Sequence, residues 1–76
     1  MASGGDPFYI SYPGGSIVES IEVGGEGSEV LADVDAAGRV VGIELVDASI
    51  PESVELARRF AAERGLEFPP NIVPPA

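Results

Sequence analysis

The chain has 76 residues, of which 45% are hydrophobic, and its 13 acidic side chains against four arginines give a formal net charge of -9. This length allows one small domain with a modest core, and the apolar content is that of a globular chain. The absence of cysteine, histidine and lysine excludes, within one chain, thiol catalysis, a Ser-His-Asp triad, a Schiff-base lysine and a structural zinc site.

The acidic side chains are concentrated in the first part of the chain. Residues 1–48 hold nine of them with Arg39 as the one basic residue, whereas residues 49–76 hold four acidic residues and three arginines. Such a surface repels phosphate groups and anionic lipid, so we expect no nucleic-acid and no membrane partner, while a basic protein partner is allowed. Because no long apolar run and no leader-like start is present, we expect a cytoplasmic protein. No cofactor is expected.

Two strands are predicted after a disordered start at residues 1–6, and the single domain is expected over residues 7–66. From Pro7 onward, apolar residues at 8, 10 and 12 alternate with their neighbours, which predicts a strand, and the PGG at 13–15 is typical of a turn. A second strand is predicted over residues 16–23, and GGEGS at 24–28 is a flexible connector. On this strand Ile17, Glu19, Ile21 and Val23 share one face, and Val18, Ser20 and Glu22 the other.

A hairpin is predicted around DAAG at 35–38, between strands over residues 29–35 and 39–47. Asp35 is favoured at the first position of a type I turn, because its carboxylate can accept backbone amide hydrogen bonds. Gly38 suits the left-handed corner that follows. Strict alternation places Val41, Ile43 and Leu45 on one face of the fourth strand, and Val40, Gly42, Glu44 and Val46 on the other.

A helix is predicted over residues 51–64. Ser49 or the residue after it is expected to cap the helix, and Pro51 suits the first turn and disfavours a helical Ile50. Ser49 with Glu52 forms a capping-box pattern. Gly65 is expected to end the helix, with Leu66 folding back onto it. Glu55 and Arg59 are spaced for an ion pair, and the apolar stripe consists of Val54, Ala57, Phe60 and Ala61.

The tail at 67–76 contains four prolines, which predict an extended segment. Its apolar residues Phe68, Ile72 and Val73 can dock on the body of the domain or on a neighbour.

Together these elements predict an α+β fold, an antiparallel four-stranded meander with one C-terminal helix packed on one sheet face and an extended Pro-rich tail. The other sheet face mixes apolar and acidic side chains, which is typical of an interaction surface and also of ordinary protein surface. We take this face as the candidate interaction surface, formed by Tyr9, Val18, Glu22, Leu31, Asp33, Val40, Glu44 and Val46. With so small a core, we expect a homodimer through this face or an open sheet edge.

Three patterns resemble chemical sites without meeting their requirements. The spacing of Asp33, Asp35 and Gly38 resembles the start of an EF-hand loop, but Ala37 stands where a ligand is needed. Asp33 and Glu44 could face each other as a glycosidase pair, yet the chain is too short to enclose a sugar. The GGEGS loop lacks the lysine of a phosphate-binding loop. We therefore expect no enzymatic activity, no catalytic residues and no metal site.

Glu19 is unusual because it shares the core face with Ile21 and Val23. We expect it to lie at the rim and meet Arg58 or Arg59, or to be turned outward by a bulge.

The segments DPFYI at 6–10 and ADVDAAGRVVGIELVDAS at 32–49 resemble the small prokaryotic family known as domain of unknown function 2283. The resemblance covers residues 6–49. Members usually begin with an extra strand that ends in tyrosine and aspartate, and MASGG stands in its place here, which leaves a sheet edge open for a partner strand. The family implies no known activity, cofactor or catalytic residue, but its members resemble companions of small toxin-like proteins.

Two functional hypotheses follow. The first is a non-catalytic protein-interaction module that associates with itself. The alternative is an antitoxin-like or inhibitory acidic partner of a small basic protein, which would use Glu22, Asp33 and Glu44.

Overall fold

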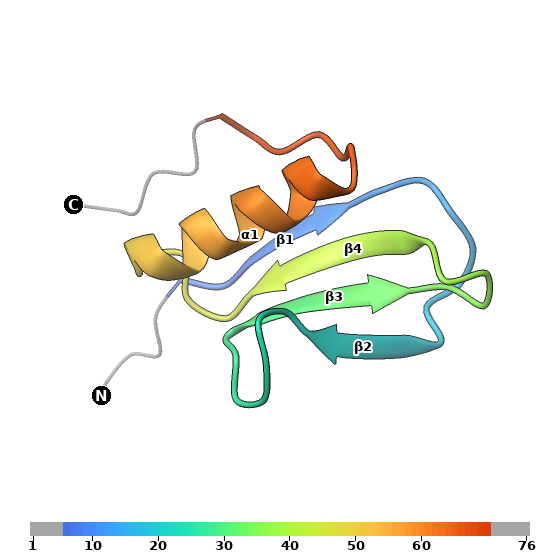
Figure 1. Cartoon of the computed structure of the whole chain (residues 1–76), viewed down its shortest axis with the longest axis horizontal. Coiled ribbons are helices and arrows are strands. Elements are labelled where there is room, and N and C mark those ends of the chain that lie inside the picture. Colours follow the sequence, from blue (N-terminus) through green and yellow to red (C-terminus); the bar gives the residue numbers. More distant parts are fainter. Residues whose placement is uncertain (1–5, 71–76) are drawn as a thin grey trace.

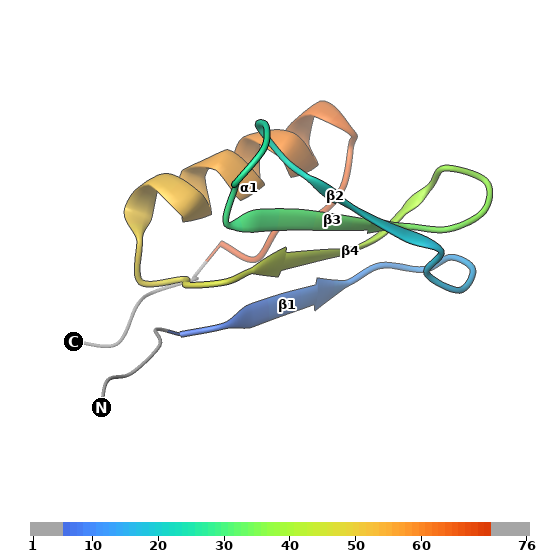
Figure 2. The same ribbon diagram turned by 90° about the horizontal axis from the view of Figure 1, so that it is seen from below.

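The computed structural model describes residues 6–70, which form four strands and one helix (Figure 1). The strands are β1 (Phe8–Ser11), β2 (Glu19–Glu22), β3 (Val30–Val34) and β4 (Val40–Leu45), and the helix is α1 (Pro51–Glu63). The strands form one antiparallel sheet with α1 on one of its faces, which confirms the predicted α+β fold (Figure 2). The predicted disordered start lies outside the described residues except for Asp6, and so does the tail beyond residue 70.

The sheet has the strand order β1-β4-β3-β2. Strands β2, β3 and β4 follow one another as a meander, whereas β1 lies on the outer side of β4. The two edges of the sheet are therefore β1 and β2, although these strands are consecutive in the sequence (Figure 1).

The segment between β1 and β2 crosses the end of the sheet where the β3–β4 hairpin closes (Figure 1). The predicted turn at 13–15 belongs to this crossing and does not join neighbouring strands. Val18 N–H donates a hydrogen bond to the Val34 carbonyl at 2.9 Å. Gly14 lies so close to the sheet that a β carbon there would stand 2.2 Å from Val41 Cγ1. The crossing segment thus covers Val41, and only a glycine fits at this approach.

The β3–β4 hairpin has the predicted turn. Gly38 N–H donates to the Asp35 carbonyl at 2.9 Å, and Gly38 adopts a φ of +81°. The Asp35 carboxylate accepts hydrogen bonds from the amides of Ala37 and Arg39, at 2.9 Å each, and of Gly15, at 3.0 Å. These amides, with Gly15 contributing most, lower the pKa of Asp35. The Asp35 carboxylate therefore connects the hairpin with the crossing segment through hydrogen bonds.

A β-bulge changes the alternation of β4. Asp33 pairs with Gly42, but the next residue, Val34, pairs with Val40, so β4 has one extra residue at this point. An extra residue exchanges the two faces of a strand. Val40 therefore packs in the core beside Val34, which corrects its predicted place on the interaction face.

The core lies between the sheet and α1. Its largest fully buried side chains are Val30, Ile43 and Leu45, and each such side chain stabilises the fold by about 1.5–3 kcal/mol. The helix contributes the predicted stripe of Val54, Ala57, Phe60 and Ala61.

The start of α1 at Pro51 is as predicted, but the capping box is not formed. Ile50 is the N-cap in an extended conformation without a side-chain cap, because Pro51 disfavours a helical residue before it. The predicted capping box between Ser49 and Glu52 is therefore wrong. The Ser49 hydroxyl instead donates to Asp47 at 2.5 Å, and Asp47 also accepts the amides of Ser49 and Asp6. This hydroxyl, followed by those amides, lowers the pKa of Asp47.

The end of α1 is as predicted. Gly65 adopts a φ of +69°, Gly65 N–H donates to the Ala62 carbonyl at 3.2 Å and Leu66 N–H to the Ala61 carbonyl at 2.8 Å. This pair of bonds is a Schellman motif, and Leu66 packs against the core after it.

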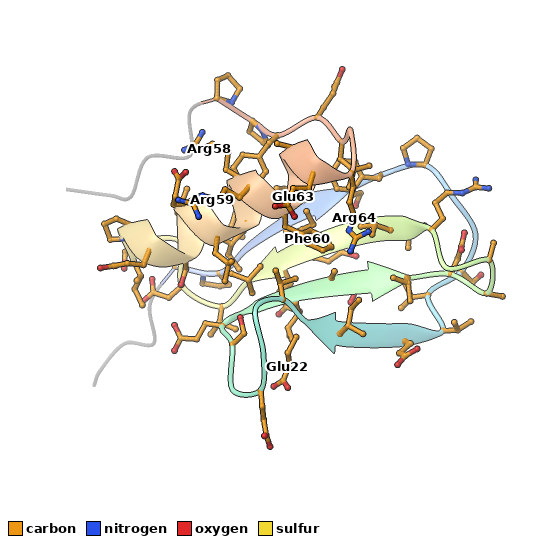
Figure 3. All side chains as sticks on the ribbon, in the orientation of Figure 1. Glu22, Arg58, Arg59, Phe60, Glu63 and Arg64 are labelled. Carbon is orange, nitrogen blue, oxygen red and sulfur yellow. The ribbon has the colours of Figure 1, made fainter. Side chains whose placement is uncertain are left out.

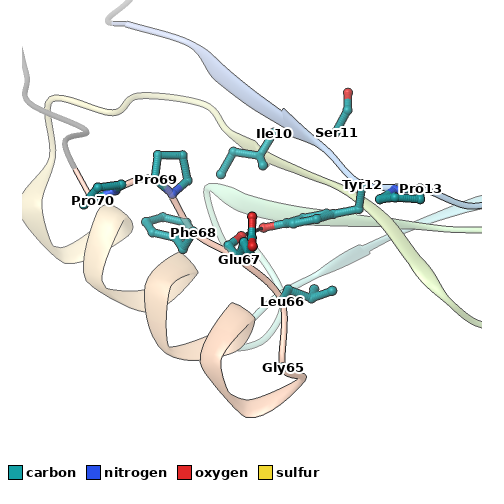
Figure 4. Close-up of a pocket in the computed structure, with 10 residues that line it drawn as sticks. All are labelled: Ile10, Ser11, Tyr12, Pro13, Gly65, Leu66, Glu67, Phe68, Pro69 and Pro70. Atoms are coloured by element: carbon teal, nitrogen blue, oxygen red, sulfur yellow. Dashed lines mark hydrogen bonds between the residues drawn. The ribbon is translucent and has the colours of Figure 1, made fainter.

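The described part of the tail turns back along the body (Figure 4). The Tyr12 hydroxyl donates to the Glu67 carbonyl at 2.6 Å, and Phe68 packs against the core, which is the first of the two places expected for it. The Arg58 guanidinium lies 5.5 Å from the centre of the Phe68 ring. The tail and β1 border a groove of about 620 Å³, lined among others by Ile10, Tyr12, Leu66 and Phe68.

Candidate interaction surface

The sheet face opposite α1 carries most of the predicted interaction residues. The strand pairing places Tyr9, Glu44, Leu31 and Glu22 in one row across β1, β4, β3 and β2. Cross-strand neighbours in a row present their side chains on the same face. The adjacent row consists of Ser11, Gly42, Asp33 and Ser20.

Asp33 is the polar centre of this face. Its two carboxylate oxygens accept hydrogen bonds from the Tyr9 hydroxyl at 2.7 Å and the Ser20 hydroxyl at 2.5 Å. Asp33 was predicted as part of the candidate interaction surface, but it is only 6% exposed. Its hydrogen bond is the main cause that raises the pKa of Tyr9 to about 12, followed by burial and the charges of Asp33 and Glu44. Asp33 thus links both edge strands to the centre of the sheet.

Gly42 leaves the space through which the Tyr9 side chain reaches Asp33. The Tyr9 ring crosses β4 above Gly42, where a β carbon would stand 1.9 Å from the Tyr9 Oη atom and 2.5 Å from Cζ. The alternation pattern places Gly42 on this face without indicating a role. Only the pairing of β1 with β4 and of β4 with β3 puts Tyr9 and Asp33 on either side of it.

The remaining predicted residues differ in exposure. Glu22 is exposed, and its carboxylate accepts a hydrogen bond from the Gly27 amide at 3.1 Å, which stabilises the loop at 24–28. The others are Val18 at 62% and Val46 at 46% exposed, and the half-buried Leu31 and Glu44. Tyr9, Val18 and Val46 are thus the exposed apolar side chains of the predicted set, and the acidic Glu22 and Glu44 are interspersed among them.

The arginines gather on the helix. Glu55 pairs with Arg59 at 3.7 Å, as predicted, and also with Arg58 at 3.4 Å. Glu19 was expected to meet one of these arginines, but within residues 6–70 it forms no salt bridge. Its cross-strand partner is Val34, so Glu19 lies on the helix side of the sheet edge. Arg64 stacks 4.5 Å from the centre of the Phe60 ring.

A group of large apolar side chains is exposed along β2, which the strand order places at an edge of the sheet. Ile17, Val18 and Ile21 are 52%, 62% and 38% exposed. Strand β2 has β3 on one side and, among the residues that the structure describes, no strand on the other. Ile21 pairs with the buried Ala32 and therefore faces α1. The sequence predicted a strand over residues 16–23, but not that it would be an edge.

A groove of about 390 Å³ separates β2 from α1. Ile21, Leu56 and Phe60 supply its apolar lining. The polar lining from the helix consists of Arg59, Glu63 and Arg64 (Figure 3).

The patterns considered for chemistry have other roles in the structure. Asp33 and Asp35 accept hydrogen bonds from the protein itself, and Asp33 pairs with Gly42 rather than with Glu44. Residues 6–70 contain no group of three or more side chains placed to hold a metal ion. No helix in this part of the chain has the length and apolar character needed to cross a membrane.

Residues 5–49 match the family described as protein of unknown function (DUF2283). The match covers more than half of the chain, so the chain belongs to this family, and the predicted resemblance is confirmed. It includes the whole sheet and ends before α1. No curated protein and no solved structure matches the chain.

Proposed function

We propose that this member of the family is a non-catalytic protein-interaction module that forms a homodimer through its β2 edge. The exposed Ile17, Val18 and Ile21 carry the proposal, because three large apolar side chains border a strand with an unpaired side. An exposed edge of this kind favours pairing with another chain unless it is blocked.

The edge is favoured over the open sheet face. On that face, Asp33 is satisfied by Tyr9 and Ser20, and Val40 belongs to the core. A partner covering the face would contact Tyr9 and Val46, but it would also remove Glu22 and Glu44 from water, which is costly unless these charges are paired. At the β2 edge, a partner strand gains backbone hydrogen bonds and covers exposed apolar area.

The solution mass of two matched variants tests the proposal. Val18→Lys places a charge beside β2, and Val46→Lys places the same charge at an exposed valine outside the strands. We expect a dimer at micromolar concentration for the wild type and for Val46→Lys, and a monomer for Val18→Lys. A wild-type monomer, or a dimer that Val46→Lys alone disrupts, would contradict the use of this edge.

A second candidate function is an acidic or inhibitory partner of a small basic protein. It is supported by the separation of charge, because Glu22 and Glu44 lie in one row of the open face without a basic residue, while three of the four arginines lie on α1 or its C-cap. Binding of a basic peptide should weaken steeply with salt and with Glu44→Gln. Equal binding at low and high salt would exclude this function.

A further inference from the structure

The groove between α1 and β2 is lined by side chains of both charges, Arg59 and Arg64 together with Glu22 and Glu63. Arg59 is paired with Glu55. Glu19 lies on the helix side of β2 and forms no salt bridge within residues 6–70. Arg64 likewise forms no salt bridge within these residues, and it stacks on Phe60 at the groove. Arg64 is therefore the basic side chain of this groove that has no salt bridge within residues 6–70, and a carboxylate from a partner strand can pair with it. Strand β2 itself carries such a carboxylate, Glu19, two residues before the apolar Ile21.

We propose that the second copy occupies this groove with its own β2, in an antiparallel pairing centred on Ser20. This register rests on the homodimer proposed above and specifies its contacts. Glu19 of each copy then lies opposite Ile21 of the other, at the mouth of the groove that Arg64 lines. The interface is isologous, so each contact forms twice.

The alternative registers are less favourable. A centre at Glu19 or Glu22 would place two carboxylates directly opposite each other, which destabilises a strand pair. A centre at Ile21 would place Glu19 opposite Val23, which is 7% exposed and precedes the loop at 24–28. With the centre at Ser20, no like charges lie opposite each other. Glu19 of one copy then lies beside Ile21 of the other, near Arg64.

A charge exchange tests the contact between Glu19 and Arg64. We expect Glu19→Arg and Arg64→Glu each to weaken the dimer by about tenfold, because two weak attractions become repulsions. The double variant should bind to itself within about threefold of the wild type. Arg58→Glu is the matched control, since Arg58 lies on the same helix but faces Phe68 of the tail, and it should leave the dimer unchanged. The measurement is the dimer dissociation constant by sedimentation equilibrium, with circular dichroism to verify folding.

Oxidative cross-linking tests the register without altering charge. The chain has no cysteine, so Ser20→Cys introduces the sole thiol. Opposite residues of an antiparallel pair are about 4.5–5.5 Å apart at Cα, which is within disulfide range. We expect a covalent dimer from Ser20→Cys and none from Ile17→Cys. If the wild type is a dimer but the charge exchange has no effect and Ser20→Cys does not cross-link, this register is wrong while self-association stands. If the wild type is monomeric, both proposals fail.

Discussion

The hydrogen bond between Tyr9 and Asp33 offers a direct test of how the open sheet face is held together. Tyr9→Phe removes one of the two hydroxyl donors of a carboxylate that is 6% exposed. A hydrogen bond to a charged group contributes about 1.5–3 kcal/mol. Tyr9 is 44% exposed, so water can replace its hydroxyl, and we expect a loss below this range, about 1 kcal/mol. For a domain of this size that corresponds to a melting temperature lower by about 4–8 °C.

Gly42→Ala should also break the hydrogen bond between Tyr9 and Asp33. The new methyl group would meet the end of the Tyr9 ring rather than the backbone, so the ring can move aside, but only by leaving Asp33. We expect a loss of about 1–3 kcal/mol in the wild type. In the Tyr9→Phe background the bond is already absent, so Gly42→Ala should cost less by about 1 kcal/mol.

Urea denaturation of the four proteins of this cycle at neutral pH measures the coupling. Ser11→Ala replaces Tyr9→Phe in a control cycle, because Ser11 is the direct β1 neighbour of Gly42, whereas the hydroxyl groups that bind Asp33 belong to Tyr9 and Ser20. The control coupling should stay below about 0.3 kcal/mol. If the losses of Tyr9→Phe and Gly42→Ala add within the same limit, Gly42 does not act through Tyr9.

Two further predictions concern pH. The lowered pKa values of Asp35 and Asp47 mean that both carboxylates stabilise the fold fully above their ordinary value of 3.8, and that this stability is lost as the pH falls through the lower folded pKa. Melting temperatures at acidic pH should decrease below that value, less steeply for Asp35→Asn, and an unchanged slope would contradict the role of Asp35. Tyr9 acts in the opposite direction, because its folded pKa of about 12 exceeds the ordinary 10.0, so its contribution is complete below pH 10.0 and is lost as the pH rises through about 12. Absorbance titration of tyrosinate should show a component at high pH that disappears in Tyr9→Phe, and titration of Tyr9 near its ordinary value would refute the effect of Asp33.

The features that the sequence predicted correctly depend on residues close together in the chain. The turn at Asp35 and Gly38 needs only its own amides and a left-handed glycine, and Gly65 ends α1 in the same way. The apolar stripe of α1 and the alternation of the strands follow from the period of each element. These signals were sufficient for the α+β class and the helix bounds.

The interaction surface could be predicted only in part, because its properties depend on which strands pair. Tyr9, Leu31 and Glu44 lie on the predicted face, but Val40 does not, since one bulge exchanged the faces of β4. No local pattern indicates that Asp33 would accept hydrogen bonds from hydroxyl groups on two different strands. The exposure of Ile21 likewise depends on β2 being an edge.

The sequence by itself therefore determined the elements, their turns and the helix end, because short-range hydrogen bonds and periodicity act within a few residues. Tertiary structure alone decided that β1 lies beside β4, that Asp33 is buried between Tyr9 and Ser20, and that β2 has an unpaired side. Strand order is chosen by contacts between distant residues that bury the common core against α1. For this reason, the surface on which the proposed function rests emerges only in the folded chain.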